Sequence, residues 1–452
     1  MIKGWKRMTA AALAGAMVFS LAACGAKEQA GTAQETQSNQ EGTAGGEKKK
    51  IKITWWGGQG RHEYTQKLLD LYTQSHPDIE FEAIPSGWDG YFDKLATQAA
   101  SGSMPDIVQM DYLYIATYAK NNSIADLQKY IDEGTIDTAG IDDKILNTGK
   151  INGKMAGMVC SSSIISTGYN PEVLQAAGVE APASDWTWSD FVEIGRKISE
   201  KTGKESILTS TGVTSDTNLF NYWVRQHGKP LFNEAGTGLG FDDDKITADF
   251  FNMWKGMMDE DISPNPDEMS QIVSLGQEAG PVVTGDAAFT FDWNNYASRM
   301  SKVNDKLKIA TPPLSDDSDS KGLWIKPGQF FSIAETSKVK DECAEFINWF
   351  INSKEANDII MAERGTPVSA EIRDYMVESG KMDAQQIEMF EYVDKAAALS
   401  GETPAPDPAG ISEVNEAFNK AGNSVFYGQM TPEEGAAAFR KDASAILERN
   451  NK

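Results

Sequence analysis

Several predicted strands are followed by aromatic and planar polar side chains, a combination suited to binding a small polar molecule. Residues 51–56, 105–110 and 287–292 have the apolar pattern of strands. The side chains that end or follow these segments are Trp56, Gln59, Arg61, Asp111, Tyr112, Trp293 and Asn294. An aromatic ring can cover the apolar face of a ligand, while carboxylate, amide and guanidinium groups hydrogen-bond pairs of polar atoms at its edge. These residues are therefore the first candidates for a ligand site.

Four residues elsewhere extend this candidate set. Trp88 is predicted in a loop before a helix, where an exposed indole is costly without a ligand to cover it. Trp223 lies in a helical region, and Phe330 follows a Pro-Gly-Gln turn near a predicted chain crossing. Arg364 precedes the turn at 366–368 and is expected to face the ligand opening.

Most of these candidates have a structural alternative that the sequence leaves open. Trp56 can pack in the core, Arg61 can form a salt bridge at a helix start, and Asp111 can cap the helix that follows it. Trp223 has a spacing that also suits core packing, and Arg364 can be a surface residue near a helix end. Trp186 and Trp188, in contrast, are predicted to be structural, because they flank a helix start.

Signatures of catalysis and of cofactor binding are absent from the sequence. It contains no HExxH, GxSxG, P-loop or GxGxxG pattern, and none of its three histidines is paired with a nucleophile. Cys160 and Cys343 belong to no Cys/His cluster, which argues against a metal site, and Cys343 has the pattern of a buried helical residue. Residues 317–328 place Lys and Gly where a calcium loop requires oxygen ligands. We expect no cofactor and no metal.

The charge of the chain restricts its partners. The formal net charge is −24 and the pI is about 4.6. Such a chain is repelled by the phosphates of nucleic acids and by an anionic membrane surface, so nucleic acid is not an expected partner. Attachment to a membrane would require a covalent or hydrophobic anchor.

The N-terminal residues have the pattern of a lipoprotein signal. Basic residues precede an apolar run at 8–21 that is too short to span a bilayer, and residues 21–25 read Leu-Ala-Ala-Cys-Gly. This pattern predicts a signal peptide at 1–23 and diacylglycerol on Cys24; the alternative is an ordinary secretory signal cut near Ala23. Residues 24–49 have almost no large apolar side chains, which predicts a flexible tether.

Strand and helix patterns alternate from residue 51 onward. A strand at 51–56, a helix with Tyr64, Leu68 and Tyr72 on one face, and a strand at 79–84 are followed by another helix and strand. This order predicts right-handed crossovers and a parallel sheet, with ligands beyond the carboxyl ends of the strands. A second α/β body is expected after Gly153, with helices at 188–201, 250–258, 341–364 and 411–449.

The order and spacing of many short motifs resemble the extracellular sugar-binding proteins of ABC importers, of the maltodextrin-binding type. The resemblance covers residues 50–450. Its motifs lie at 55–58 (WWGG), 88–95, 102–108 (GSMPDIV), 153–157, 169–171, 177–179, 186–191 (WTWSDF), 285–288 and 344–350.

This resemblance implies an α/β fold of the periplasmic-binding-protein type (type II), with two lobes and a sugar bound between them. The implied lobes are residues 50–157 with 311–340, and residues 158–310 with 341–452. Crossings between the lobes are expected near 153–160, 309–313 and 331–340. The implied protein is a non-enzymatic monomer, lipid-anchored outside the cytoplasm, that delivers a carbohydrate to a membrane permease by closing its lobes around it.

A narrower likeness concerns the branch tied to uptake of pectin (rhamnogalacturonan) fragments. It rests on residues 55–62, 109–111 and 363–369. If the ligand carries a uronate, Arg61 and Arg364 become candidate carboxylate partners, because arginine binds carboxylates through two parallel hydrogen bonds.

Two other functions fit parts of the sequence. A secreted glycoside hydrolase would also be rich in tryptophan and acidic residues, but it needs two carboxyl groups facing one sugar. A binding protein for a peptide or a polyamine would keep the fold and change the solute. The lipoprotein signal and the motif order favour sugar binding without turnover.

Overall fold

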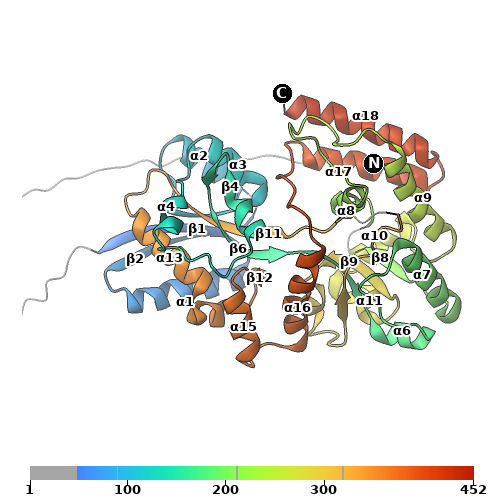
Figure 1. Ribbon diagram of the computed structural model, residues 1–452, viewed down its shortest axis with the longest axis horizontal. Helices are drawn as coiled ribbons and strands as arrows, with labels where there is room; N and C mark the ends of the chain where they lie inside the picture. The colour runs from blue at the N-terminus through green and yellow to red at the C-terminus, as the bar shows by residue number, and fades with distance from the viewer. Residues whose placement is uncertain (1–47, 89, 210–211, 318–319, 452) are drawn as a thin grey trace, which may run out of the picture. The chain divides into compact units, whose positions relative to one another are not determined.

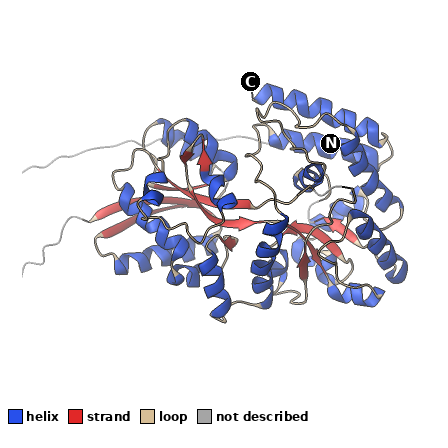
Figure 2. Cartoon of the chain, viewed as in Figure 1, coloured by secondary structure: helices blue, strands red, loops and turns tan. Residues whose placement is uncertain are grey.

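The computed structural model describes residues 48–88, 90–209, 212–317 and 320–451. These residues form two main sheets, each flanked by helices, and a small two-stranded sheet (Figures 1 and 2). The mixed α/β architecture confirms the predicted fold class. Residues 1–23, Cys24 and most of the predicted tether lie outside the described residues. In the described ranges, helices with the length and apolarity needed to cross a membrane are absent.

The first sheet has six strands, and its parallel part is the one that the sequence predicts. In sheet order the strands are β12 (Thr366–Pro367), β6 (Met158–Ser163), β11 (Lys326–Ile333), β3 (Ile107–Met110), β1 (Lys49–Trp56) and β2 (Ile79–Ser86). Strand β1 pairs in parallel with β2 and β3, while β11 runs antiparallel to β3 and β6. The helices that follow these first strands are α1 (Gln59–Ser75), α2 (Tyr91–Ala100) and α3 (Tyr112–Lys120). Ile51, Ile53 and Leu68 are fully buried, as their predicted periodicity requires.

The second sheet has four strands and carries most of the later helices. In sheet order the strands are β10 (Lys308–Ala310), β7 (Ile165–Tyr169), β9 (Phe289–Trp293) and β8 (Ile207–Thr209). The helices that follow in this body are α6 (Pro171–Ala177), α7 (Trp188–Thr202), α8 (Asn218–Gln226), α9 (Lys245–Asp259), α10 (Pro266–Ser274), α11 (Pro281–Thr284), α12 (Tyr296–Met300), α16 (Ala384–Leu399), α17 (Ile411–Phe426) and α18 (Pro432–Asn450). Strands β8 and β9 are parallel, so both end at the same edge of the sheet.

Smaller elements complete the first body. They are α4 (Gln128–Asp132), α5 (Asp143–Leu146), and the hairpin of β4 (Lys150–Ile151) with β5 (Lys154–Met155). The start of α7 confirms the structural role predicted for its tryptophans. Trp186 and Trp188 are each 3% exposed, and the indole of Trp188 donates to Gln226 Oε1 at 2.8 Å. Thr187 and Asp190 form a capping box at this helix start.

The boundaries between the two bodies differ from the predicted ones. Helices α13 (Lys340–Asn352) and α14 (Lys354–Ile360) belong with the first sheet, because Phe346 packs against Phe81 with ring centroids 4.9 Å apart. Strand β6 at 158–163 also belongs to the first sheet. The chain passes to the second sheet between β6 and β7, returns between β10 and β11, and crosses again between β12 and α16. The crossing expected at 331–340 is wrong, because β11 and α13 both lie in the first body.

Candidate functional site

A lysine and a tryptophan bring the two sheets together at their strand ends. Trp293 is the last residue of β9, and Lys326 is the first residue of β11. The Lys326 Nζ lies 4.7 Å from the centroid of the Trp293 ring. A cation over an indole face is attracted by the negative face of the ring. This contact fixes the position of Trp293, a predicted ligand residue, relative to the first sheet.

Three carboxyl groups surround this contact. Asp111 precedes α3 and accepts a hydrogen bond from the Leu113 backbone N–H at 2.9 Å, so it does cap the helix. The charges of Lys326, Asp216 and Asp111 all act on the Asp407 carboxyl group, so Asp407 lies near these three residues. We call Asp111, Asp216, Trp293, Lys326 and Asp407 the Trp293 cluster.

Desolvation dominates the electrostatics of two of these carboxyl groups. It raises the pKa of Asp111, while the Leu113 N–H and Lys326 oppose the rise. Desolvation also raises the pKa of Asp407, with Lys326 opposing and the other two carboxylates adding to the rise. Asp407 is nevertheless an exposed residue, so it does not lie in the core. Carboxylates that are poorly solvated and accessible are ready to accept hydrogen bonds from a ligand.

The second sheet contributes a small cavity beside Trp293. It measures about 60 Å³, and Asp216, Asn218, Asp292 and Trp293 are among the residues that line it. Asp292 is paired with Arg299 at 2.9 Å and is 8% exposed. Asp216 is the other carboxylate of this wall, and its Oδ1 accepts a hydrogen bond from the Asn218 backbone N–H at 2.8 Å. An indole face beside carboxylate oxygens can bind a ring that has an apolar face and hydroxyl groups at its edge.

Tyr112 joins the C-terminal part of the chain to this site. Its hydroxyl donates to the Pro404 carbonyl at 2.9 Å, and its ring stacks on Phe330 with centroids 6.0 Å apart. Phe330 is fully buried, so it packs against the Tyr112 ring from the core and has no surface open to a ligand.

Trp56 and Trp88 form an aromatic group at the end of β1. Trp56 is 7% exposed and packs edge-on against Trp88, with ring centroids 5.2 Å apart. Trp88 is 46% exposed and also lies 6.3 Å from the ring of Tyr114 in α3. Of the two, Trp88 is therefore the one with a face free for a ligand. Trp56 packs in the core, which was its structural alternative.

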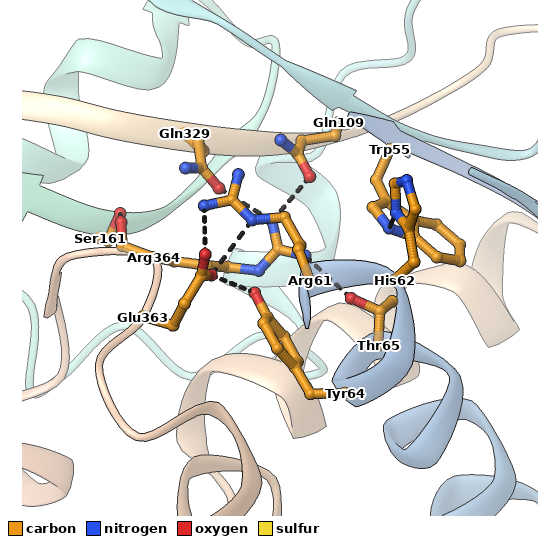
Figure 3. Close-up of polar contacts among 10 residues, drawn as sticks. All are labelled: Trp55, Arg61, His62, Tyr64, Thr65, Gln109, Ser161, Gln329, Glu363 and Arg364. Carbon is orange, nitrogen blue, oxygen red and sulfur yellow. Dashed lines mark hydrogen bonds and ion pairs between the residues drawn. The ribbon is translucent and has the colours of Figure 1, made fainter. Parts of the chain in front are cut away.

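The two arginines that were candidate carboxylate partners bind protein groups instead (Figure 3). Arg364 is 5% exposed, and its Nη1 donates to Gln109 Oε1 at 2.6 Å and to Gln329 Oε1 at 2.8 Å. Burial lowers its pKa. Arg61 forms a salt bridge with Glu363 at 3.0 Å, which is its structural alternative. The expectation that Arg364 faces the opening is wrong, because its long side chain runs back into the first body.

Three more candidates lie in packing positions. Trp223 donates from its indole to the Ile246 carbonyl at 2.8 Å, within the helices of the second body. Asn294 is 1% exposed, accepts from the Ile164 N–H at 3.1 Å and donates to Thr366 Oγ1 at 3.2 Å, so it ties the strand junction together. Gln59 is exposed and bonds Glu63 in the same helix at 2.9 Å.

A model of the family described as bacterial extracellular solute-binding protein matches residues 58–357. This chain belongs to that family. A solved family 1 solute-binding protein from Alicyclobacillus acidocaldarius is 27% identical, with a TM-score of 0.78 over 89% of this chain and 99% of that one. An oligogalacturonide-binding protein from Yersinia enterocolitica is also 27% identical, with a TM-score of 0.73 over 89% of this chain and 100% of that one. The same Yersinia protein has been solved with saturated digalacturonic acid.

The lactose-binding protein of Rhizobium radiobacter is 26% identical over 200 residues, which is 41% of this chain and 44% of that protein. The aligned region thus spans less than half of that relative.

Three residues of the Trp293 cluster escaped the sequence analysis. They are Asp216, Lys326 and Asp407, and Asp216 and Asp407 lie in segments without strand or helix periodicity. Lys326 is the first residue of a strand, and no sequence pattern distinguishes a lysine of a ligand site from any other lysine at that position. Cys160 and Cys343 are both free thiols, and Cys343 is fully buried, as predicted. Among the described residues, no group of His, Cys, Asp and Glu side chains is arranged to hold a metal ion.

Proposed function

We propose that this solute-binding protein captures an oligosaccharide at the Trp293 cluster and delivers it to the permease of an ABC importer. The observation that supports this most is the contact of Lys326 with Trp293, because it joins an aromatic face from one sheet to carboxylates beside the other. A pyranose ring stacks its C–H face on the indole, and its hydroxyls donate to Asp111 and Asp407.

The proposed substrates are fragments of pectin. The likeness to oligogalacturonide-binding proteins supports this class, at 27% identity over nearly the whole folded chain. Within that class, the Trp293 cluster favours units without a carboxylate. Arg61 and Arg364 are committed to protein partners, and Lys326 is outnumbered by Asp111, Asp216 and Asp407. A uronate placed there would meet like charges.

The protein binds its ligand without cleaving it. We also propose that acyl chains on Cys24 anchor it to the outer surface of the cell membrane. Two or more acyl chains hold a protein on a bilayer durably, at about 0.8 kcal/mol per buried CH₂ group. The charge of −24 makes such an anchor necessary, because the chain itself is repelled by anionic lipids.

Isothermal titration with two matched series of oligosaccharides tests this proposal. Galactobiose to galactotetraose are neutral, and di- to tetragalacturonic acid have the same ring stereochemistry with a carboxylate at C6. We expect one ligand per chain, tighter binding of the neutral series, and recovery of intact sugar by chromatography. Absence of binding by both series, or the appearance of shorter products, would refute the proposal.

A further inference from the structure

A second, larger cavity lies beside the Trp293 cluster in the second body. Its volume is about 320 Å³, and it lies among β8, α9, α10 and α17. It falls within the range of roughly 300–1,000 Å³ that is usual for small-molecule sites.

Two buried polar atoms without a protein partner belong to residues that line this cavity. The indole Nε1 of Trp254 and the hydroxyl Oγ1 of Thr209 have no hydrogen-bond partner in the protein. Trp254 is 1% exposed and Thr209 is 8% exposed. An unpaired buried donor costs about 1–3 kcal/mol, so each such group requires an explanation. A ligand that brings an acceptor to the indole N–H and a partner to the hydroxyl would satisfy both.

The lining of the cavity is polar but uncharged. Its polar groups are hydroxyls, the Trp254 indole and the side-chain amides of Asn419 and Asn423, and its apolar surface includes Met258 and Phe426. Asn423 Nδ2 donates to Asn419 Oδ1 at 2.5 Å, which holds the two amides in place. None of the lining residues is charged, so a carboxylate or an ammonium group would lose its hydration without an ionic partner. The cavity therefore suits a neutral, hydroxylated ring.

This cavity adjoins the small cavity beside Trp293. Thr209, Gly212 and Val213 line both the 320 Å³ cavity and the 60 Å³ cavity that contains Asp216 and Trp293. Gly212 has φ of +99°, a conformation that residues with a side chain rarely adopt. A ligand longer than one unit can thus extend from Trp293 past the carboxyl end of β8.

We infer that the 320 Å³ cavity is a second subsite, which binds a neutral terminal sugar unit of an oligosaccharide whose preceding unit stacks on Trp293. The inference rests on the proposed function and adds to it a ligand length and a position that rejects a charged unit. The Trp254 N–H donates to a ring or hydroxyl oxygen, and the Thr209 hydroxyl bonds a second hydroxyl. Galactotriose or galactotetraose fills both sites, while galactobiose fills chiefly the first.

Two conservative substitutions remove the proposed contacts without emptying the cavity. Thr209→Val deletes the hydroxyl, and Trp254→Phe deletes the indole N–H. We expect each to weaken galactotetraose binding by roughly 3- to 10-fold. Trp254→Phe should also change galactobiose binding less than about 2-fold, because Trp254 lines only the 320 Å³ cavity, whereas Thr209 lines both cavities. Thr167→Val is the matched control, because Thr167 also has a buried hydroxyl without a partner but lines neither cavity. It should leave both affinities unchanged.

An independent readout is the indole N–H resonance of Trp254, assigned by its absence from the spectrum of Trp254→Phe. It should shift when galactotetraose is added to the wild-type protein and move much less with galactobiose. If galactotetraose binds but the resonance stays in place, or the variants bind all lengths like the wild type, the second subsite is refuted and the proposed function stands. If the wild-type protein binds no galacto-oligosaccharide or oligogalacturonide, the proposed function fails as well.

Discussion

Replacing Arg364 with methionine separates a structural role from a ligand-binding role at a residue where the sequence favours the second. Arg364 is 5% exposed, and its guanidinium donates to the side-chain oxygens of Gln109 and Gln329 (Figure 3). It also lies 5.4 Å from the ring centroid of Phe350 and 5.7 Å from that of Phe331. Methionine has a similar length and can keep these apolar contacts, so Arg364→Met removes mainly the hydrogen bonds.

The size of the change in stability depends on which polar groups lose their partners when these hydrogen bonds are removed. Gln109 is fully buried and its Nε2 already has no partner, so loss of Arg364 leaves its whole amide unsatisfied. That costs about 1–3 kcal/mol, and the lost bonds to a charged donor contribute about 1.5–3 kcal/mol each. The substitution also removes a buried cation that has no bonded carboxylate, and burying such a charge is unfavourable, so part of this loss in stability is offset. We expect a net loss of about 2–4 kcal/mol in the free energy of unfolding.

Urea denaturation measures this loss, and titration with galactotetraose measures the affinity. Arg61→Met is the matched control. Its salt bridge with Glu363 is partly exposed, so its loss should cost at most about 1 kcal/mol. Both variants should keep the wild-type affinity within about 2-fold. If Arg364→Met kept its stability and lost the sugar, Arg364 would be a ligand residue and the structural reasoning would be refuted.

Three further outcomes are expected. Trp293→Ala should weaken oligosaccharide binding about 10-fold in titration calorimetry, since roughly 60 Å² of covered ring face at about 25 cal/mol/Å² gives about 1.5 kcal/mol; an unchanged affinity would contradict stacking there. Asp407→Asn should stabilise the ligand-free protein near pH 8, because the raised pKa of Asp407 means that its ionised form is disfavoured in the fold. That gain should shrink as the pH falls toward the ordinary Asp pKa of about 4, and a gain independent of pH in thermal unfolding would exclude this cause. Cys24→Ser should move the protein from the membrane fraction to the soluble fraction, and its retention on membranes would contradict lipid anchoring at Cys24.

The secondary structure of the first body could be predicted because its pattern is local. Alternation at 51–56 and the helical spacing of Leu68 and Tyr72 depend only on which side chains face the core. The assignment of 341–364 to a body failed for a physical reason. An amphipathic helix shows which of its faces is buried, but its periodicity does not identify the sheet it packs on, and Phe346 packs on the first one.

The candidate site was predicted only in part, and side-chain length explains much of the difference. Trp293 and Asp111 follow strands, so the rule for the carboxyl ends of strands finds them. Arg364 lies next to the expected position, but its side chain is long enough to turn inward and satisfy Gln109. Asp407 reaches the site from an irregular segment far along the chain, and no local pattern encodes such an approach.

The most direct test of the central claim is a crystal structure of the protein with galactotetraose. The account predicts one sugar ring stacked on Trp293 with hydroxyls bonded to Asp111 and Asp407, and an intact chain that continues past Thr209. A sugar bound away from Trp293, or one found cleaved, would contradict it.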